Sequence, residues 1–167
     1  MSYLFQDWHA NRRNFKGQLV MLMFRLVSLI NRSMVAKVVF FPYLVLYCYA
    51  VEWVWGIEIP RKTKIGKGLS LYHGQALVLN QGVILGDNCT LRNSVTIGHK
   101  KLADGTFSRC PRLGNHVDVG ANVVIIGDIE IGDNVVIGAG SVVTKSIPAN
   151  SVAVGNPARI LDKKETL

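Results

Sequence analysis

The chain has 167 residues, which is long enough for one hydrophobic core and predicts one domain with an appendage. Apolar residues make up 49% of the sequence and charged residues 18%, which excludes a disordered chain. The net charge of +8 predicts an anionic partner, and the lack of interleaved aromatic and basic residues argues against nucleic acid.

Residues 1–56 are predicted to form a helical N-terminal region. The first residues, MSYLFQDWHANRRNFKG, do not resemble a secretory signal peptide. An apolar run at 38–51 contains Pro42 and is shorter than a membrane-spanning helix, which needs about 20 residues. We therefore expect a buried helical segment there. The apolar positions with helical spacing nearer the N-terminus, interrupted by Arg25 and Arg32, are Leu19, Leu22, Met23, Leu26 and Ile30.

A six-residue repeat follows Gly56. Written in sixes from Leu113, the sequence is LGNHVD, VGANVV, IIGDIE, IGDNVV, IGAGSV, VTKSIP, and an aliphatic residue opens every block. From Ile59 the blocks are IPRKTK, IGKGLS, LYHGQA; two extra residues then shift the frame to LNQGVI, LGDNCT, LRNSVT. A period of six excludes an α-helix and a hairpin sheet, whose apolar periods are 3.6 and two. It predicts a parallel β-helix over residues 57–160, followed by a tail at 161–167.

One extended loop interrupts this repeat. Between Gly98 and Leu113 lies the segment HKKLADGTFSRCPR, with four basic groups and an Asp-Gly turn. A long loop that leaves a solenoid usually belongs to a functional site, although solenoids also tolerate plain surface insertions. We favour the functional interpretation.

The three cysteines, Cys48, Cys89 and Cys110, are too widely spaced for a disulfide framework or a metal site. Free cysteines of this kind predict a protein of the reducing cytoplasm. No helix N-terminus or adjacent histidine that would lower the pKa of Cys110 is evident, which argues against a nucleophilic role for this thiol.

The sequence resembles the left-handed β-helix acyltransferases, a superfamily of trimers that use acetyl-CoA or related thioesters. The resemblance covers about residues 56–160 and is carried by GIEIPRKTKIGKGLSLYHG, NSVTIG, RCPRLGNHVDVGANVVIIGDIEIGDNVVIGAGSVV and SIPANSVAVGNPAR. These segments are similar to the serine acetyltransferase branch and to bacterial polysaccharide O-acetyltransferases of the colanic acid type. The resemblance implies a mainly β, left-handed parallel β-helix and an acetyl-CoA-dependent acyltransferase. Left-handed winding rests on the resemblance alone, because crossover connections are otherwise right-handed.

The resemblance implies that His73 is the catalytic general base. Serine acetyltransferases have an Asp at a fixed spacing before the catalytic His, and Glu58 stands at that same spacing before His73 in this chain. An ordinary histidine pKa of about 6.5 suits the removal of a hydroxyl proton near neutral pH. The carboxylate would fix the ring tautomer and stabilise the imidazolium. Taken without the resemblance, His73 could instead be a corner residue bonded to a backbone carbonyl.

The last coils are implied to bind acetyl-CoA, because an extended pantetheine arm can follow their regular backbone. Small residues at the corners and two cations near the nucleotide phosphates would make this site. The residues concerned are Gly120, Ala121, Ala139, Gly140, Lys145 and Arg159. The same glycines would also serve simply to turn the corners.

Two departures from the family pattern concern the acceptor. The family has an Asp directly before the catalytic His, where this chain has Tyr72, and a His after the Arg at the loop's end, where this chain has Arg109 and then Cys110. Both positions are implied to hold the amino acid substrate. We therefore predict O-acetylation of a sugar hydroxyl in a bacterial surface polysaccharide or its lipid-linked oligosaccharide precursor.

The expected acceptor site comprises Tyr72, His99, Arg109 and Cys110, and Asn80, Gln81 and Phe107 are further candidates for sugar contacts. Backbone amides near the loop or the Arg109 guanidinium would stabilise the developing oxyanion. The alternative function is a serine O-acetyltransferase of cysteine biosynthesis.

A β-helix protein without acyl transfer, such as a γ-type carbonic anhydrase, would need three zinc-binding imidazoles with a close pair. His73, His99 and His116 are widely separated in the sequence and include no such pair. We predict no metal site, and we expect His116, in a regular block, to lie at the surface.

The apolar prism predicts a homotrimer with sites between neighbours, with a dimer of trimers as a further option. Residues 1–56 carry six basic and two acidic groups, a net charge of +4. This charge predicts that the helices either pack trimers together or contact the inner face of the plasma membrane peripherally, in an otherwise cytoplasmic protein.

Overall fold

The computed structural model describes residues 2–161, so all but the first residue of the expected C-terminal tail lies outside the described residues. Helical elements occupy the N-terminal part, and every strand follows Gly56. The helical elements are η1 (Tyr3–Phe5), α1 (Phe15–Ile30), α2 (Met34–Val39), α3 (Phe41–Tyr47) and the π-helical η2 (Cys48–Val54).

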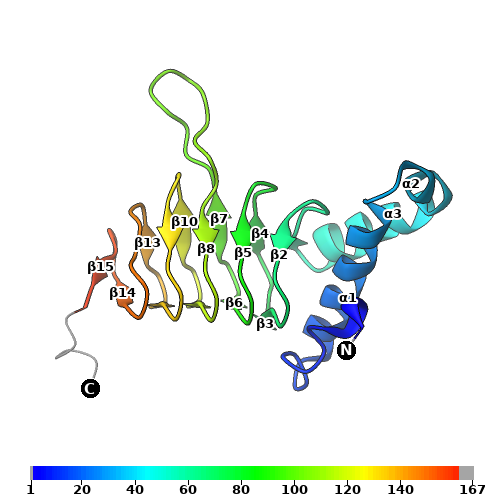
Figure 1. Cartoon of the computed structure of the whole chain (residues 1–167), viewed down its shortest axis with the longest axis horizontal. Helices are drawn as coiled ribbons and strands as arrows, with labels where there is room; N and C mark the ends of the chain where they lie inside the picture. The colour runs from blue at the N-terminus through cyan, green and yellow to red at the C-terminus, as the bar shows by residue number, and fades with distance from the viewer. Residues whose placement is uncertain (1, 162–167) are drawn as a thin grey trace.

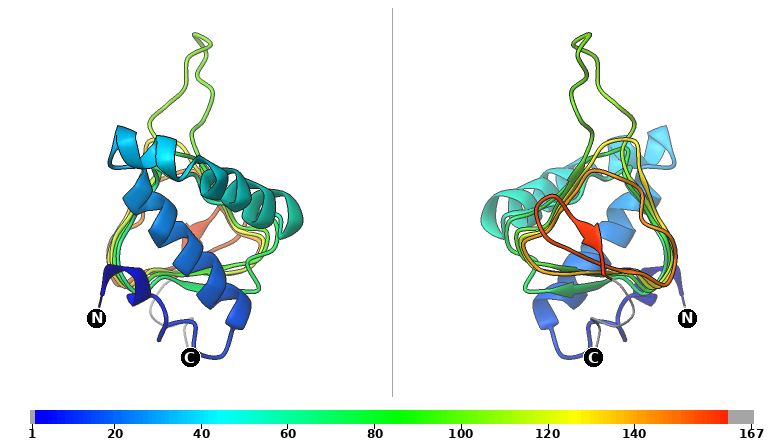
Figure 2. Two further views of the ribbon diagram at one scale, coloured as in Figure 1. Left: turned by 90° about the vertical axis from the view of Figure 1, so that its right-hand side faces the viewer. Right: turned by 90° about the vertical axis from the view of Figure 1, so that its left-hand side faces the viewer.

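The strands wind into a prism with three parallel sheets as its faces (Figures 1 and 2). The first sheet contains β1 (Ile57–Glu58), β4 (Leu77–Leu79), β7 (Thr96–Gly98), β10 (Val124–Ile126) and β13 (Val142–Val143). The second contains β2 (Lys64–Ile65), β5 (Ile84–Leu85), β8 (Arg112–Leu113) and β11 (Glu130–Ile131). The third contains β3 (Ser70–Tyr72), β6 (Thr90–Arg92), β9 (Asp118–Val119), β12 (Val136–Ile137), β14 (Val152–Val154) and the antiparallel β15 (Arg159–Ile160). The mainly β solenoid predicted from the six-residue repeat is confirmed.

Two corners of the prism matter for the site. We call the corner between the third and first sheets the His73 edge; it comprises residues 73–76, 93–95, 120–123 and 138–141. The corner between the first and second sheets is the loop edge, with residues 80–83, 99–111, 127–129 and 144–147. Each coil crosses both corners once.

Two positions of each six-residue block point into the core. The openers are buried, apart from the half-buried Ile65. The fifth position of the block is also buried in every block except that of Gln75, a regularity that the opener pattern alone did not reveal. Buried residues at the fifth position are Thr63, Leu69, Val83, Cys89, Val95, Val117, Val123, Ile129, Val135, Ser141 and Ile147.

The two extra residues of the repeat lengthen the first turn of the His73 edge, the turn at residues 73–76. A regular coil consists of three blocks, and its register places Val124 opposite Val142. The first coil is longer by two positions, and its register places Ser70 opposite Thr90. The enlargement falls between β3 and β4, where His73 has a φ of 66° and Gly74 a φ of 60°. The corner that departs from the repeat therefore carries the candidate base.

The predicted loop leaves the prism between β7 and β8 and projects far from it (Figure 1). An antiparallel bridge between Lys101 and Phe107 makes it a narrow hairpin. At its tip, Asp104 accepts hydrogen bonds from the backbone N–H and hydroxyl of Thr106. The loop is therefore a hairpin held by its own hydrogen bonds, and it extends from the loop edge.

The N-terminal segment caps the open end of the solenoid with side chains. The Asp7 carboxylate accepts from the Leu69 N–H (2.9 Å), and the Asn11 amide bonds both the Leu69 carbonyl (2.7 Å) and the Leu71 N–H (2.9 Å). The Tyr47 hydroxyl donates to the Ile59 carbonyl (2.8 Å). The first coil has no preceding coil to pair with, which would leave some of its backbone groups without partners. These side chains supply the missing hydrogen bonds.

Helix α1 forms where the spacing predicts a helix, but its buried side differs from the row of apolar positions with helical spacing. Ile30 is buried, whereas Leu26 is exposed and Arg25, which breaks the apolar pattern, is only 1% exposed. Its guanidinium donates to Asp7 (2.7 and 3.1 Å) and to the carbonyls of Ile65 and Gly66. The helix is apolar around most of its surface, so spacing could not select the face. The buried apolar residues are Val20, Met21, Phe24, Val27 and Ile30.

The expectation of a buried segment at 38–51 is also largely wrong. Leu44, Tyr47 and Val51 form one buried stripe, and the opposite side has no partner within the described part of the chain. No helix among residues 2–161 is both long and apolar enough to span a membrane. We call the uncovered surface the apolar helical face; it comprises Met34, Val35, Val38, Val39, Phe40, Phe41, Val45, Leu46, Tyr49, Trp53 and Val54.

Candidate active site

The candidate base His73 lies exposed at the enlarged corner of the His73 edge. The backbone is held around it by short turns: the Gly74 N–H donates to the Tyr72 carbonyl and the Gln75 N–H to the His73 carbonyl, both at 2.8 Å. The ring borders two hollows, one toward the N-terminal helices and one along the edge beside Asn93 and Ser94. A reactant could therefore approach His73 from either side.

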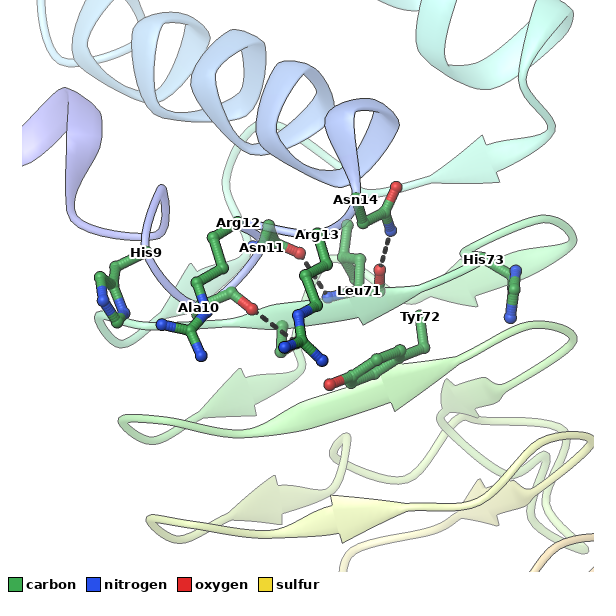
Figure 3. A pocket seen from close by; sticks show the side chains of 10 residues that line it. His9, Ala10, Asn11, Arg12, Arg13, Asn14, Leu71, Tyr72 and His73 are labelled. Carbon is green, nitrogen blue, oxygen red and sulfur yellow. Dashed lines mark hydrogen bonds between the residues drawn. The ribbon is translucent and has the colours of Figure 1, made fainter.

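The hollow toward the N-terminal helices has a volume of about 490 Å³ (Figure 3). The segment between η1 and α1 forms one wall, and strand β3 with its corner forms the other. Neither wall contributes a carboxylate. The lining residues are His9, Ala10, Asn11, Arg12, Arg13, Asn14, Ser70, Leu71, Tyr72 and His73. We call it the acceptor hollow. The sequence alone indicates Arg12 and Arg13 only as positive charge, because a wall of this kind depends on contacts between residues far apart in the sequence.

Tyr72 presents a half-exposed ring to this hollow. The Arg92 guanidinium lies 5.6 Å from the ring centroid on the neighbouring coil. Arg92 is itself bound to the Asp118 carboxylate and the Val119 carbonyl, and the hydrogen bond with Asp118 raises its pKa. A cation held on one side of a Tyr ring in this way orients the ring.

Glu58 and His73 are not paired in the structure. Among the described residues, neither a hydrogen bond nor an ion pair joins them. Glu58 points outward from the flat face of β1, whereas His73 lies on the corner. The charge of Glu58 acts instead on another carboxylate, Glu52. The pKa of Glu52 is raised first by burial and then by the charge of Glu58. The spacing of Glu58 and His73 in the sequence predicts that they meet between neighbouring coils. In the structure one residue lies on a face and the other on a corner, without a hydrogen bond or ion pair between them.

A second cluster forms at the base of the loop. The Asn80 amide donates to His99 Nδ1 (2.7 Å), and Cys110 Sγ donates to Asn80 Oδ1 (3.4 Å). The His99 ring packs edge-on against Phe107 with centroids 4.3 Å apart. Burial raises the pKa of the Cys110 thiol. Arg109 is exposed beside this cluster.

His99, Arg109 and Cys110 all lie on the loop edge, whereas Tyr72 and His73 lie at the His73 edge. The predicted acceptor residues are therefore divided between two corners of one prism. Within a single chain the structure does not bring them together.

The predicted small residues for acetyl-CoA lie on the His73 edge, in coils beyond His73. Gly120 and Ala139 stack so closely that a Cβ on Gly120 would lie 2.5 Å from the Ala139 nitrogen. The Gly140 N–H donates to the Ala121 carbonyl (2.8 Å). These four corner positions carry only Gly and Ala, so no large side chain from them would obstruct an extended thioester arm.

Lys145 and Arg159 share one hollow of about 440 Å³ near the C-terminal end of the solenoid. It lies between the corner after β13 and the β14–β15 pair, and no carboxylate among residues 2–161 lines it. Two cations around a hollow without acids fit the phosphates of a nucleotide.

His116 and Cys89 occupy positions that the solenoid itself explains. His116 occupies an exposed corner with a φ of 54°, where Asn134 and Asn150 stand in later coils. Cys89 is fully buried in the core, and burial raises its pKa. Within residues 2–161, no three His, Cys, Asp or Glu side chains are close enough together to hold a metal ion.

Comparison with known proteins agrees with the fold. Residues 111–145 match the family of bacterial transferase hexapeptide proteins (six repeats), and residues 75–99 match the hexapeptide repeat of succinyl-transferase. The chain is 44% identical over 119 residues to WcaB of Escherichia coli K12, which is named as a putative colanic acid biosynthesis acetyltransferase; the match spans 71% of this chain and 72% of WcaB.

Solved structures of serine acetyltransferases superpose on nearly the whole chain. The soybean apoenzyme has a TM-score of 0.80 and 29% identity over 95% of this chain and 67% of its own. The enzyme from Brucella abortus in complex with coenzyme A has a TM-score of 0.77 and 27% identity over 95% and 66%. The repeat, the left-handed solenoid with its helical cap and these relatives together establish that the chain belongs to the hexapeptide-repeat acyltransferases and is an acetyltransferase similar to WcaB and to serine acetyltransferases.

Proposed function

We propose that this enzyme transfers an acetyl group from acetyl-CoA to a sugar hydroxyl during the synthesis of a bacterial surface polysaccharide, in the cytoplasm. The observation that carries the proposal is the acceptor hollow beside His73. It offers an aromatic ring, amides and cations, and no carboxylate that would hold the ammonium group of an amino acid. The 44% identity to WcaB supports the same acceptor class.

His73 would act as the general base in a direct transfer. Bound acetyl-CoA supplies the acetyl group as a reactive thioester. His73 takes the proton of the acceptor hydroxyl as that oxygen bonds the acyl carbon, and the resulting imidazolium returns the proton to the departing sulfur. Glu58 would stabilise the imidazolium once the bound reactants bring the two side chains together, since catalytic hydrogen bonds often tighten only in the reactant complex.

The cosubstrate would extend along the His73 edge. Gly120, Ala121, Ala139 and Gly140 leave this edge open for the pantetheine arm. The phosphates would lie beyond it at the C-terminal end of the solenoid, where Lys145 on the loop edge and Arg159 would neutralise them. Tyr72 would stack on the sugar ring, and His99, Arg109 and Cys110 would reach the acceptor from the loop of a neighbouring protomer.

A homotrimer would bring the two parts of this site together. The loop projects away from its own prism (Figure 2). Because His73 lies on another corner, one protomer's loop would complete the site of its neighbour. Small residues and closed symmetry favour such an arrangement. A dimer of trimers, joined through the helices, is the larger assembly this chain could form.

Peripheral membrane contact is proposed for the apolar helical face. Eleven large apolar side chains are exposed there, including Trp53 at 83%, and Arg32 and Lys37 lie on the same helical region. An apolar hollow of about 440 Å³ between α1 and α3 adjoins it. Apolar surface flanked by cations suits an anionic bilayer, where each basic group contributes about 1 kcal/mol, and lipid-linked acceptors are found there.

A second candidate is serine O-acetyltransferase, which the TM-score of 0.80 to the soybean enzyme favours. An acceptor screen separates the two: acetyl-CoA is offered with free serine, nucleotide sugars and lipid-linked oligosaccharides, and product is detected by mass. We expect sugar acetylation and no useful turnover of serine. Efficient serine acetylation with a Michaelis constant of about 1 μM to 1 mM would assign the enzyme to cysteine biosynthesis instead.

The same screen tests His73. His73→Ala should lower kcat about 10²- to 10⁴-fold while coenzyme A binding is retained, because the proposed cosubstrate residues lie in later coils. His116→Ala, an exposed corner histidine on the remaining edge, is the matched control and should leave kcat near wild type. Near-normal turnover by His73→Ala would remove this residue from the mechanism.

A further inference from the structure

We infer that the acceptor carries an oxyanion, a phosphate or carboxylate, and that Arg12 and Arg13 bind it in the acceptor hollow. This inference rests on the proposed function and specifies the substrate class of that same site. It concerns two residues to which neither the six-residue repeat nor the catalytic proposal assigns a role.

The two arginines are held at the hollow by the segment that carries them. On either side of them, the Asn11 amide bonds the backbone of Leu69 and Leu71, and the Asn14 amide donates to the Leu71 carbonyl. The Ser70 hydroxyl donates to the Ala10 carbonyl (3.2 Å). The wall is therefore fixed to β3 on both sides of Arg12 and Arg13, and Figure 3 shows their guanidinium groups on the Tyr72 side of this wall. A fixed backbone reduces the entropy that two long side chains lose when they bind a ligand.

Neither arginine has an anionic partner within the described residues. The ion pairs of the structure join Arg25, Lys67, Arg92 and Arg112 to carboxylates, and none involves Arg12 or Arg13. No Asp or Glu of residues 2–161 lines the hollow, and the His9 imidazole is a further nitrogen base there. Helix α1 begins at Phe15, directly after them, so the positive end of its dipole adds to the same potential.

The chemistry points to an oxyanion next to the sugar. Adjacent guanidinium groups bind phosphate or carboxylate oxygens with paired, charge-assisted hydrogen bonds. The hollow extends from His9 to His73, so one ligand can have its anion near Arg12 and Arg13 and a hydroxyl near the His73 ring. The cosubstrate phosphates have their own candidate cations, Lys145 and Arg159, at the opposite end of the solenoid (Figure 1). Three sources share this chemistry: a nucleoside-diphosphate sugar, a pyrophosphate-linked lipid sugar and a uronic acid.

The test compares acceptors matched except for charge. Initial rates with acetyl-CoA are measured for a neutral methyl glycoside, its uronic acid counterpart, the UDP-sugar and a short-chain lipid pyrophosphate sugar. The wild type is compared with Arg12→Gln/Arg13→Gln and with Arg61→Gln/Lys62→Gln. Arg61 and Lys62 are also consecutive and exposed. Their substitution removes the same amount of positive charge at a site outside the acceptor hollow. Thermal unfolding confirms that each variant is folded.

We expect the Arg12→Gln/Arg13→Gln variant to raise KM for the anionic acceptors about tenfold or more, with KM for acetyl-CoA and for the neutral glycoside unchanged. Inorganic pyrophosphate should compete with the acceptor in the wild type and in the Arg61→Gln/Lys62→Gln variant, and should lose this effect in the Arg12→Gln/Arg13→Gln variant. The acceptor whose KM changes most identifies the source of the anion.

Three results would overturn the inference. If sugars are acetylated without preference for charge, or if both double variants raise KM equally, Arg12 and Arg13 do not recognise an anion, while the proposed function stands. If the wild type acetylates no sugar at all, the proposed function fails and this inference fails with it.

Discussion

At the scale of single residues, an irregular backbone distinguishes the corner that carries the candidate base. His73 and Gly74 both have positive φ in a corner that is two residues longer than its neighbours, and the extra length presents His73 to two hollows. His116 also has positive φ, but it stands in a regular corner where later coils have Asn. The irregular corner, rather than the residue type, separates the candidate base from a histidine that merely turns the chain.

Cys110 offers a pH-dependent prediction at the same scale. Burial raises its thiol pKa, so less thiolate is present at neutral pH than in free cysteine, and reactivity should rise only as pH climbs above the ordinary value of about 8.5. Iodoacetamide labelling followed by mass spectrometry should be slower for Cys110 than for free cysteine at pH 7. Intact mass after mixing with acetyl-CoA should show no acetyl group on this residue. Fast labelling at neutral pH together with an acetylated Cys110 would support a covalent route instead.

At the scale of elements, the helical cap and the first coil depend on each other. Asp7 and Arg25 form a buried pair that also bonds the backbone of Ile65, Gly66 and Leu69. Buried pairs of this kind are weak evidence for net stabilisation, but removal of one partner leaves an uncompensated charge. The cap thereby fixes the wall of the acceptor hollow to β3.

Arg25→Met should lower the free energy of unfolding by about 3–5 kcal/mol, because Asp7 would remain buried without its cation. Urea denaturation at fixed protein concentration measures this, and Lys16→Met on the same helix is the control, expected within about 0.5 kcal/mol of wild type. The double variant Asp7→Leu/Arg25→Met should recover part of the loss, since neither charge is then left alone. A loss below about 1 kcal/mol for Arg25→Met, the size of an exposed pair, would show that the pair does not hold the cap.

At the scale of the whole molecule, the residues of the proposed site are divided between two prism corners. The proposed trimer predicts a solution mass three times the 18.4 kDa of the chain, measured by light scattering. It also predicts complementation: His73→Ala and Arg109→Ala, each inactive or weak alone, should regain activity when their subunits are mixed, because some sites then receive an intact residue from each protomer. A monomer at micromolar concentration, or no gain on mixing, would contradict shared sites.

The apolar helical face gives a second prediction at this scale. The full chain should bind phosphatidylglycerol vesicles better than phosphatidylcholine vesicles, and added salt should weaken the binding. Val38→Asp/Trp53→Asp should abolish it, whereas Asn122→Asp/Asn134→Asp, an equal charge change at exposed solenoid corners, should not. If the helical variant instead halves the assembly size and vesicle binding was never present, the face packs trimers together.

The six-residue period by itself determined the solenoid, because aliphatic openers that return every six residues, such as Leu113 and Val119, fit a parallel β-helix and neither an α-helix nor a hairpin sheet. The second buried position of each block, such as Val117, became visible only in the structure. The period also located the enlarged corner and the loop, since both are departures from it. Tertiary structure alone decided the rest. The buried face of α1 depended on where Arg25 found its partners, and the separation of Glu58 from His73 depended on the difference between a face and a corner. Arg12 and Arg13 line the acceptor hollow only because Asn11 and Asn14 bind a strand distant in the sequence, a contact that no local pattern encodes.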